Sequence, residues 1–250
     1  MQKRRYTWHL MICLLGVLFA MPAHAQDLDE KIAYDAWKVI HQFEVQEGIP
    51  RGLLHSMSLV ETGLGMDGRY LPWPYTLNIN QSEKYTFSDA ESAVEKLKLL
   101  SNLGYERFNV TVDGHKADNL IVGRAKDWLT ATKGKMLTLV ARNISKRYPN
   151  KASALMAAKR LVNNGNRNFD IGLMQVNWYW HGKHFASLDE ALDPYPNVAY
   201  AVSYLRKHHE TMDWWDSVGR YHSGKQVYAN KYVASVWDMY QRVHRLKPNG

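Results

Sequence analysis

The 250-residue chain contains a single cysteine, Cys13, which lies in an apolar run near the N-terminus. Lys3, Arg4 and Arg5 precede this run, and the small-x-small pattern Ala23-His24-Ala25 follows it. This order of basic, apolar and small residues predicts a signal peptide, residues 1–25, that is cleaved after Ala25. The run is shorter than the roughly 20 residues of a membrane span, which argues against a retained anchor. The mature chain 26–250 would have no cysteine, so burial and not disulfides must stabilise it.

Acidic residues are outnumbered by basic ones, and the formal net charge is +8. Removal of the signal peptide takes away Lys3, Arg4 and Arg5 and lowers this charge to +5. A basic protein suits a polyanionic surface. Because the chain is predicted to be exported, we expect a cell-wall polymer as that surface and no nucleic acid.

The chain also lacks internal repeats, low-complexity tracts and Gly/Ser linkers, which predicts one domain. Its apolar periodicity is mostly helical. We expect helices over residues 32–43, 50–62, 88–104, 137–147, 152–162, 198–208 and 228–243, with Pro50 as the first helical residue of the second. Alternating side chains predict short strands over 75–79, 85–87 and 108–112, the first two joined around Asn80-Gln81-Ser82. The expected fold class is therefore mainly α with a small two- or three-stranded β element.

Several catalytic motifs are missing. There is no Gly-x-Ser-x-Gly and no phosphate-cradling glycine loop. The segment His209-Glu210-Thr211-Met212-Asp213 has Asp213 where a zinc-protease helix needs its second histidine. His181 and His184 have no evident third partner for a metal ion. We therefore expect neither a metal nor a cofactor.

Glu61 is the first candidate catalytic residue. It follows the apolar stripe Leu53, Leu54, Met57 and Val60 and lies in the last turn of the expected helix. A carboxyl group in apolar surroundings has a raised pKa. Such a group can stay protonated near neutral pH and act as a general acid in glycoside cleavage.

Two later segments could bind a glycan. In the segment 170–177, Gly172 permits close backbone approach, and Gln175 and Asn177 offer amide groups to sugar hydroxyls and acetamides. In the segment 218–224, Tyr221 and His222 lie in a glycine-bounded turn. Each segment alone also has an ordinary structural explanation.

Taken together and in order, these motifs resemble a known family. The lytic transglycosylases of the SLT-domain (goose-type lysozyme-like) family have four motifs: Glu-Ser, Gly-Leu-Met-Gln, Asn-x-x-Tyr and Ala-x-Tyr-Asn-x-Gly. Segments that resemble them occur here in the same order: Glu61-Thr62, Gly172-Leu173-Met174-Gln175, Asn197 with Tyr200, and Gly219 to Gly224. Pro72 to Asn78 also resembles a subgroup signature, Pro-Trp-Pro-aromatic-Thr-Leu-Asn. The resemblance covers roughly residues 35–104 and 168–240.

The resemblance implies a lysozyme-like helical domain with Glu61 as its single catalytic acid and base. The implied substrate-binding residues are Thr62, Met174, Gln175, Asn177, Tyr200, Tyr221 and His222. In such an enzyme the glutamate protonates the glycosidic oxygen and then takes the proton of the C6 hydroxyl of N-acetylmuramic acid. The sugar closes to a 1,6-anhydro end.

This sequence departs from the family pattern in four places. Thr62 replaces Ser, His222 replaces Asn, and Gly219 replaces Ala. The largest departure is an inserted segment at about 105–165, where subgroup members have only a few residues. It could be a lid, a partner surface or a passive addition.

The predicted function is cleavage of peptidoglycan glycan strands by a periplasmic lytic transglycosylase. Two alternatives stay open at this stage: a hydrolytic lysozyme, with Asp67 or Asp170 as second carboxylate, and a non-catalytic glycan-binding factor. A cell-envelope secretion or conjugation machinery is a possible partner. We expect no stable membrane span after signal cleavage.

Overall fold

The computed structural model describes residues 23–66, 68–79, 82–131, 136–142 and 144–245. The predicted signal peptide lies outside the described residues except for its last three, which begin helix α1. The helices are α1 Ala23–Gln46, α2 Leu53–Thr62, α3 Ala90–Asn102, α4 Val122–Ala131, α5 Lys151–Asn163, α6 Trp178–His181, the 3-10 helix η1 Gly182–His184, α7 Leu188–Leu192, α8 Pro194–His209, α9 Trp214–His222 and α10 Gln226–Arg245. The strands are β1 Gly63–Met66, β2 Arg69–Pro72, β3 Thr76–Ile79, β4 Glu83–Phe87, β5 Phe108–Val112, β6 His115–Leu120, β7 Leu137–Ala141, β8 Ile144–Arg147, β9 Phe169–Ile171 and β10 Val176–Asn177.

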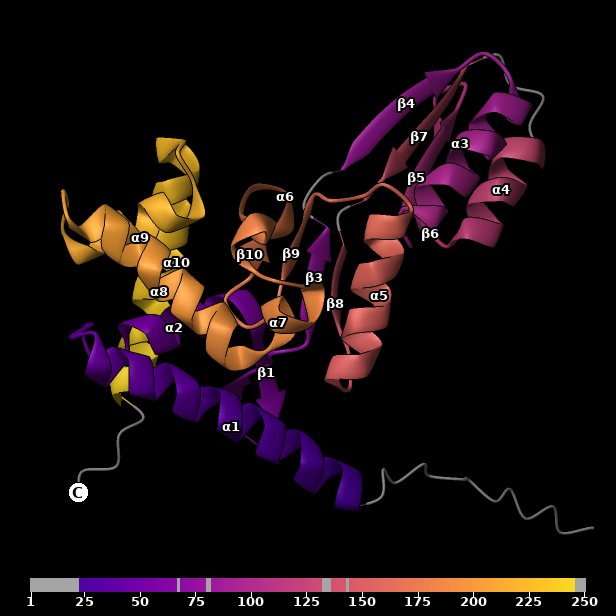
Figure 1. The fold of residues 1–250 in the computed structure, drawn as a ribbon. Helices are drawn as coiled ribbons and strands as arrows, with labels where there is room; N and C mark the ends of the chain where they lie inside the picture. The colour runs from indigo at the N-terminus through magenta and orange to yellow at the C-terminus, as the bar shows by residue number, and fades with distance from the viewer. Residues whose placement is uncertain (1–22, 67, 80–81, 132–135, 143, 246–250) are drawn as a thin grey trace, which may run out of the picture.

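Helix α2 lies at the centre of a helical cluster, with α1, α8, α9 and α10 around it (Figure 1). Its apolar side chains Leu53, Leu54 and Met57 are buried. The helix begins at Leu53, so the prediction that Pro50 is its first residue is wrong. A side chain from α1 caps it instead: the Glu44 carboxylate accepts hydrogen bonds from the backbone N–H groups of Gly52 and His55, both at 2.9 Å. The predicted end at Thr62 is confirmed.

A four-stranded antiparallel sheet, in the order β10-β9-β3-β8, lies beside this helical cluster. Strand β3 is central and pairs with β9 on one side and β8 on the other. Helices α5, α6 and α7 surround the sheet (Figure 1). This sheet and the helical cluster together position the candidate site.

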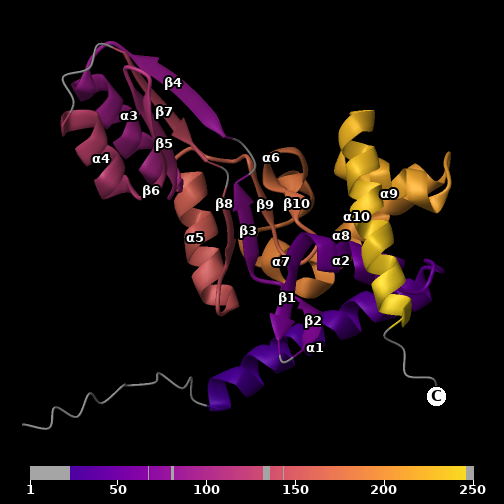
Figure 2. The same cartoon turned by 180° about the vertical axis from the view of Figure 1, so that it is seen from behind.

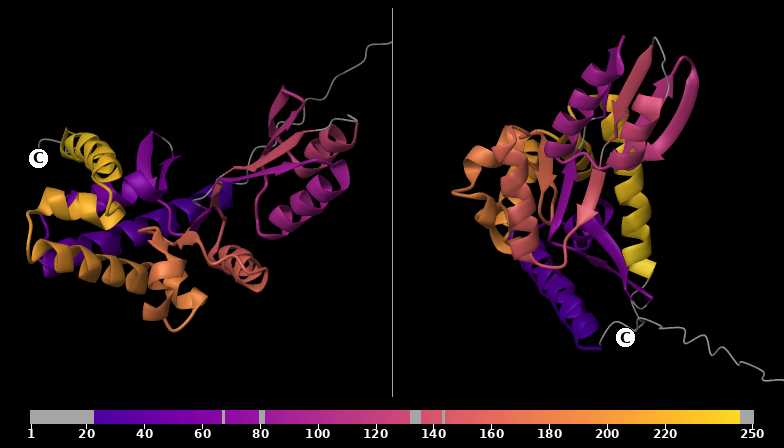
Figure 3. Two further views of the ribbon diagram at one scale, coloured as in Figure 1. Left: turned by 90° about the horizontal axis from the view of Figure 1, so that it is seen from above. Right: turned by 90° about the vertical axis from the view of Figure 1, so that its right-hand side faces the viewer.

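A second unit, residues 83–141, stands apart from the helical cluster (Figure 3). Its antiparallel sheet has the order β4-β7-β5-β6, and α3 and α4 cover one face (Figure 2). Leu137, Leu139 and Ala141 of β7 are buried, and alternate residues of β5 are buried with them. The β5–β6 hairpin turns at Asp113-Gly114, with φ angles of 45° and 87° that suit a tight hairpin turn.

The second unit is inserted in a β-hairpin. Strands β3 and β8 pair antiparallel, with Ile79 opposite Ile144. Strands β4 and β7 follow them into the unit and pair as well, beginning with Glu83 opposite Ala141. A two-stranded ribbon therefore runs from one sheet into the other. Of the segment 105–165 that the sequence marks as inserted, β8 and α5 lie outside this unit: β8 pairs with β3, and α5 contacts α7 and β3.

The mainly α fold class is confirmed, although the described strands exceed the small element expected. The prediction of a helix over 137–147 is wrong, because β7 and β8 occupy this range. Strands β3 and β4 form near the predicted places but do not pair with each other. The helix predicted over 88–104 begins at Ala90, and Asp89 caps it, because its carboxylate accepts the Ser92 N–H at 2.8 Å.

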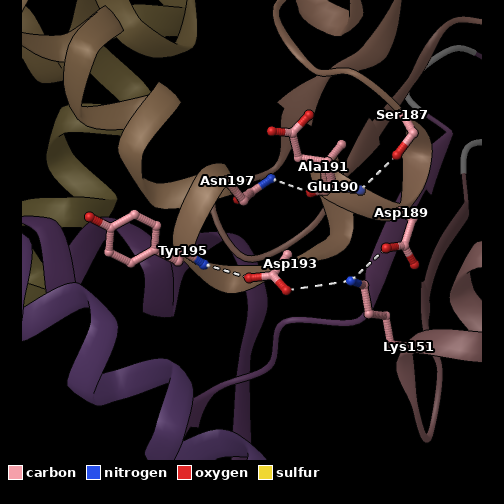
Figure 4. Close-up of polar contacts among 8 residues, drawn as sticks. All are labelled: Lys151, Ser187, Asp189, Glu190, Ala191, Asp193, Tyr195 and Asn197. Carbon is pink, nitrogen blue, oxygen red and sulfur yellow. Dashed lines mark hydrogen bonds and ion pairs between the residues drawn. The ribbon is translucent and has the colours of Figure 1, made fainter.

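The corner between α7 and α8 is fixed by polar contacts (Figure 4). Ser187 caps α7 and Asp193 caps α8. Lys151 at the start of α5 forms ion pairs with Asp189 at 3.0 Å and Asp193 at 3.4 Å. The corner sets the direction of α8, which carries Asn197 one turn further on. None of the helices in the described part of the chain is long and apolar enough to cross a membrane.

Candidate active site

Glu61 lies in the last turn of α2 and lines a cleft of about 1050 Å³. Residues from β3, β9, β10, α6, η1, α8 and α9 form the rest of the cleft. The side chain is partly buried. Burial raises the pKa of Glu61 to about 8, and the negative charge of Asp170 contributes to this increase. Glu61 is therefore mostly protonated at neutral pH, as a general acid must be.

Tyr232, from the second turn of α10, accompanies Glu61. Its buried hydroxyl has no partner within strict hydrogen-bonding distance among the described residues. It is nevertheless close enough to Glu61 to lower the pKa of that carboxyl, against the larger effect of burial. The Tyr232 ring stacks on His222 at 4.4 Å between centroids. Tyr232 falls within the helix expected over 228–243, but nothing in the sequence marks a role for its hydroxyl, which only the packing of α10 on α2 reveals.

Asp170 of β9 is a second carboxylate in the same cleft. It accepts a hydrogen bond from the Asn177 amide at 2.8 Å. The sequence named Asp170 only as a suspect, because no motif showed that β9 would lie across from the end of α2. The other suspect, Asp67, lies outside the described residues.

The Gly172-Leu173-Met174-Gln175 segment is a tight loop between β9 and β10 that is fastened to α8. The buried Asn197 side chain accepts the Met174 N–H at 2.8 Å and donates to the carbonyls of Ile171 at 3.0 Å and Ala191 at 2.8 Å. Gly172 has a φ of +83°, and a Cβ there would lie 2.4 Å from Asn197 Nδ2. Glycine is therefore required by both backbone conformation and space.

The predicted substrate-binding residues divide into two groups. Thr62 and Met174 are buried beneath the cleft, and the Thr62 hydroxyl donates to the Leu173 carbonyl at 3.1 Å. Five residues line the cleft: Gln175, Asn177, Tyr200, Tyr221 and His222. Thr62 and Met174 therefore support the Gly172–Gln175 loop from the protein interior.

Gln175 presents an unused acceptor. Its amide nitrogen donates to the carbonyls of Gly172 at 2.7 Å and Thr76 at 3.1 Å. Its side-chain oxygen Oε1 is buried and has no hydrogen-bond partner among the described residues. Because a buried acceptor without a donor is unfavourable, this atom suits an N–H or O–H group of a ligand in the cleft.

Tyr221 and Tyr200 hold the wall of the cleft. The Tyr221 hydroxyl donates to the Met174 carbonyl at 2.8 Å, which ties α9 to the loop. The Tyr200 hydroxyl lies 2.6 Å from His181 Nδ1, and burial raises the pKa of Tyr200 to about 12. In the part of the chain that the structure describes, no three His, Cys, Asp or Glu side chains are grouped to hold a metal ion.

Trp180 of α6 is a cleft residue that sequence reasoning did not single out. It is 67% exposed, and the neighbouring Tyr179 is 58% exposed and packs edge-on against it at 4.8 Å. Exposed aromatic faces at a cleft can cover the apolar faces of sugar rings. The run Trp178-Tyr179-Trp180 was the available signal, but only the fold separates buried Trp178 from exposed Trp180.

Residues 126–236 match the family model described as Transglycosylase SLT domain. The match contains the Gly172–Gln175 loop, Asn197 and Tyr221, whereas Glu61 precedes it in the chain. No curated protein and no solved structure matches the chain. The match supports the SLT family and a peptidoglycan-acting function in general.

Proposed function

We propose that this protein is a peptidoglycan lytic transglycosylase that cleaves the β-1,4 bond between N-acetylmuramic acid and N-acetylglucosamine. The observation that carries the proposal is Glu61, a carboxyl group with a pKa of about 8 at the base of a large cleft. The SLT match supports glycan strands as the substrate. The exposed Trp180 and the unused Gln175 acceptor suit a chain of N-acetylated sugars.

In the proposed reaction Glu61 donates its proton to the glycosidic oxygen while the bond between this oxygen and C1 breaks. The resulting Glu61 carboxylate takes the proton of the C6 hydroxyl, and O6 bonds to C1. The product is a 1,6-anhydromuramic acid end, and no water is consumed. The attack is intramolecular, so the nucleophile is already in place.

Asp170 supports the acid step in this scheme. Its negative charge raises the pKa of Glu61 and so favours the protonated form. It also lies in the cleft where positive charge develops on the sugar as the bond breaks. Asn177 holds its carboxylate by a hydrogen bond.

The test is mass spectrometry of the fragments that the mature protein releases from purified peptidoglycan. We expect anhydro ends, and Glu61→Gln should lower the rate by about 10²–10⁴-fold while the protein stays folded. The matched control is Glu95→Gln on the exposed side of α3, which should cleave normally. Full activity of Glu61→Gln would refute the assignment.

Asp170 also favours a second candidate function, a hydrolytic muramidase. A second carboxylate in the cleft could activate a water molecule, which would give reducing ends in place of anhydro ends. Reducing ends that disappear in Asp170→Asn would establish this alternative. Binding of glycan without any release by the wild-type protein would instead indicate a non-catalytic factor.

We further propose that the protein acts in the periplasm after cleavage of residues 1–25. The basic, apolar and Ala-x-Ala segments support this proposal. N-terminal sequencing of the exported protein should give Gln26 as the first residue. General wall turnover and local opening of the wall for a secretion or conjugation apparatus both fit the reaction, and the genes beside this one would distinguish them.

A further inference from the structure

Three cationic side chains line the candidate cleft without a carboxylate partner. They are Lys183 of η1, Lys207 of α8 and Arg220 of α9, here called the basic rim, and all three are exposed. No ion pair is formed by any of them within the described ranges, and Arg220 donates only to the Gly224 carbonyl at 3.0 Å.

The positive charge of the basic rim is felt by two histidines. Burial and then the charges of Arg220 and Lys207 lower the pKa of His208. Burial, His184 and Lys183 lower the pKa of His181, which lines the cleft. Glu61 and Asp170 are less exposed than the rim residues and lie deeper in the same cleft. The cleft therefore has acidic groups inside and unpaired cations at its opening.

This charge pattern does not match a neutral sugar chain alone. N-acetylated sugars carry no charge, so they give the three cations nothing to pair with. The carboxylates of a peptidoglycan strand are on the stem peptides, or on the lactyl groups where the peptide has been removed. Such carboxylates are repelled by Asp170 inside the cleft and attracted by the cations at its opening.

We propose that the basic rim binds carboxylates of the peptidoglycan strand, so that the protein selects anionic strands. The inference rests on the proposed function, because it names a feature of the same substrate. The sugar backbone lies over Glu61, and the charged groups project toward Lys183, Lys207 and Arg220. Binding is then partly electrostatic and depends on salt.

The test uses Glu61→Gln protein, so that binding is measured without cleavage, in sedimentation with purified cell-wall sacculi. Lys183→Gln/Lys207→Gln should bind about 2- to 30-fold more weakly at low salt, the range expected for loss of two exposed ion pairs. The matched control, Lys98→Gln/Lys126→Gln, removes the same charge from exposed positions on α3 and α4 and should bind normally. At about 1 M salt the difference should vanish, because charges are then screened beyond about 3 Å.

Three substrates identify the source of the carboxylates: intact sacculi, amidase-treated strands that have lactyl carboxylates but no peptides, and sacculi whose carboxylates are converted to neutral amides. Both sources predict weak binding to the neutralised sacculi. Strong binding to the amidase-treated strands identifies the lactyl groups, and weak binding identifies the stem peptides. Equal binding of the two double variants to intact sacculi overturns the inference. The cleavage reaction is judged separately, from the fragment ends released by protein with Glu61 intact.

Discussion

At the scale of single residues, Glu61 is held in a protonated state by its surroundings. Burial and the charge of Asp170 raise its pKa to about 8, and Tyr232 opposes them. Activity that needs the protonated acid should therefore fall as the pH rises through about 8. We expect this decline in a pH profile of kcat/KM on soluble glycan strands, because that ratio reports the free enzyme.

Substitution of Asp170 should shift the pH at which the activity declines. Asp170→Asn removes a negative charge beside Glu61, so the Glu61 pKa should fall and the decline should begin at lower pH. The control Asp127→Asn, on the exposed side of α4, should leave the profile in place. An unchanged profile in Asp170→Asn would show that the carboxylate does not influence the acid.

The same pKa predicts a stability effect. The folded-state pKa of Glu61 is above its unfolded value, 4.5, so the folded state holds the proton more tightly. As the pH rises from 4.5 to about 8 the unfolded state alone releases the proton, and the free energy of unfolding decreases. Glu61→Gln has no such loss, so its gain in Tm over wild type should grow across this range. A constant difference in thermal melts from pH 4.5 to 8 would contradict this.

At the scale of elements, the Gly172–Gln175 loop depends on space that only glycine leaves. Gly172→Ala should destabilise the protein by more than the roughly 1–2 kcal/mol of a left-handed backbone, because its Cβ meets Asn197 Nδ2 at 2.4 Å. Gly165→Ala is the matched control, since its φ is +86° but nothing lies within 4 Å of the added Cβ. Urea unfolding of both variants measures the difference, and equal losses would mean that the loop can move to accept the side chain.

Elements with strong local signals could be predicted from the sequence, and those that depend on pairing could not. The stripe of α2 and the strand over 108–112 were predicted because their patterns are local. The apolar periodicity of residues 137–147 predicted a helix, and the Leu, Ala, Lys and Arg residues among them do favour helices. In the fold, Leu137 and Leu139 are buried by α3 and the paired strands, so tertiary packing overrides local preference.

The candidate site shows the same division. Glu61, Gln175, Asn177, Tyr200, Tyr221 and His222 were predicted and line one cleft, since motifs identified them. Tyr232 and Trp180 belong to none of the motifs. Asp170 lies in the segment 170–177, but the motif assigned it no function. Their places depend on how α10, α6 and β9 meet the end of α2, which the residues themselves do not encode locally.

At the scale of the whole molecule, the hairpin insertion predicts which segment can be removed. Replacing residues 80–143 by Asn-Gly joins Ile79 to Ile144, which already lie opposite each other, through a turn that suits a hairpin. We expect this variant to fold and to keep its activity on peptidoglycan. Its Tm should be lower, because Leu161 and Ile79 lose the cover of Gly104 and its neighbours.

Removal of residues 105–165 is the contrasting deletion. It takes away β8 and α5, leaves the edge of β3 unpaired, and splits the second unit. We expect this variant to be insoluble or unfolded by circular dichroism. If it folds and is active while the 80–143 deletion is not, the division of the chain at β3 and β8 is incorrect.

The ribbon that joins the two sheets also has a consequence for the order of folding. In the unfolded chain β3 and β8 are far apart, and closing so long a loop has an entropic cost that grows with its length. The second unit is built from closer neighbours along the chain, such as the β5–β6 hairpin. Once it has formed, the pair Glu83–Ala141 holds Ile79 and Ile144 near each other. We therefore expect the sheet beside the candidate site to close from Ile79 toward Thr76 after the second unit has formed, so that a unit that holds none of the candidate catalytic residues acts as the template for its assembly.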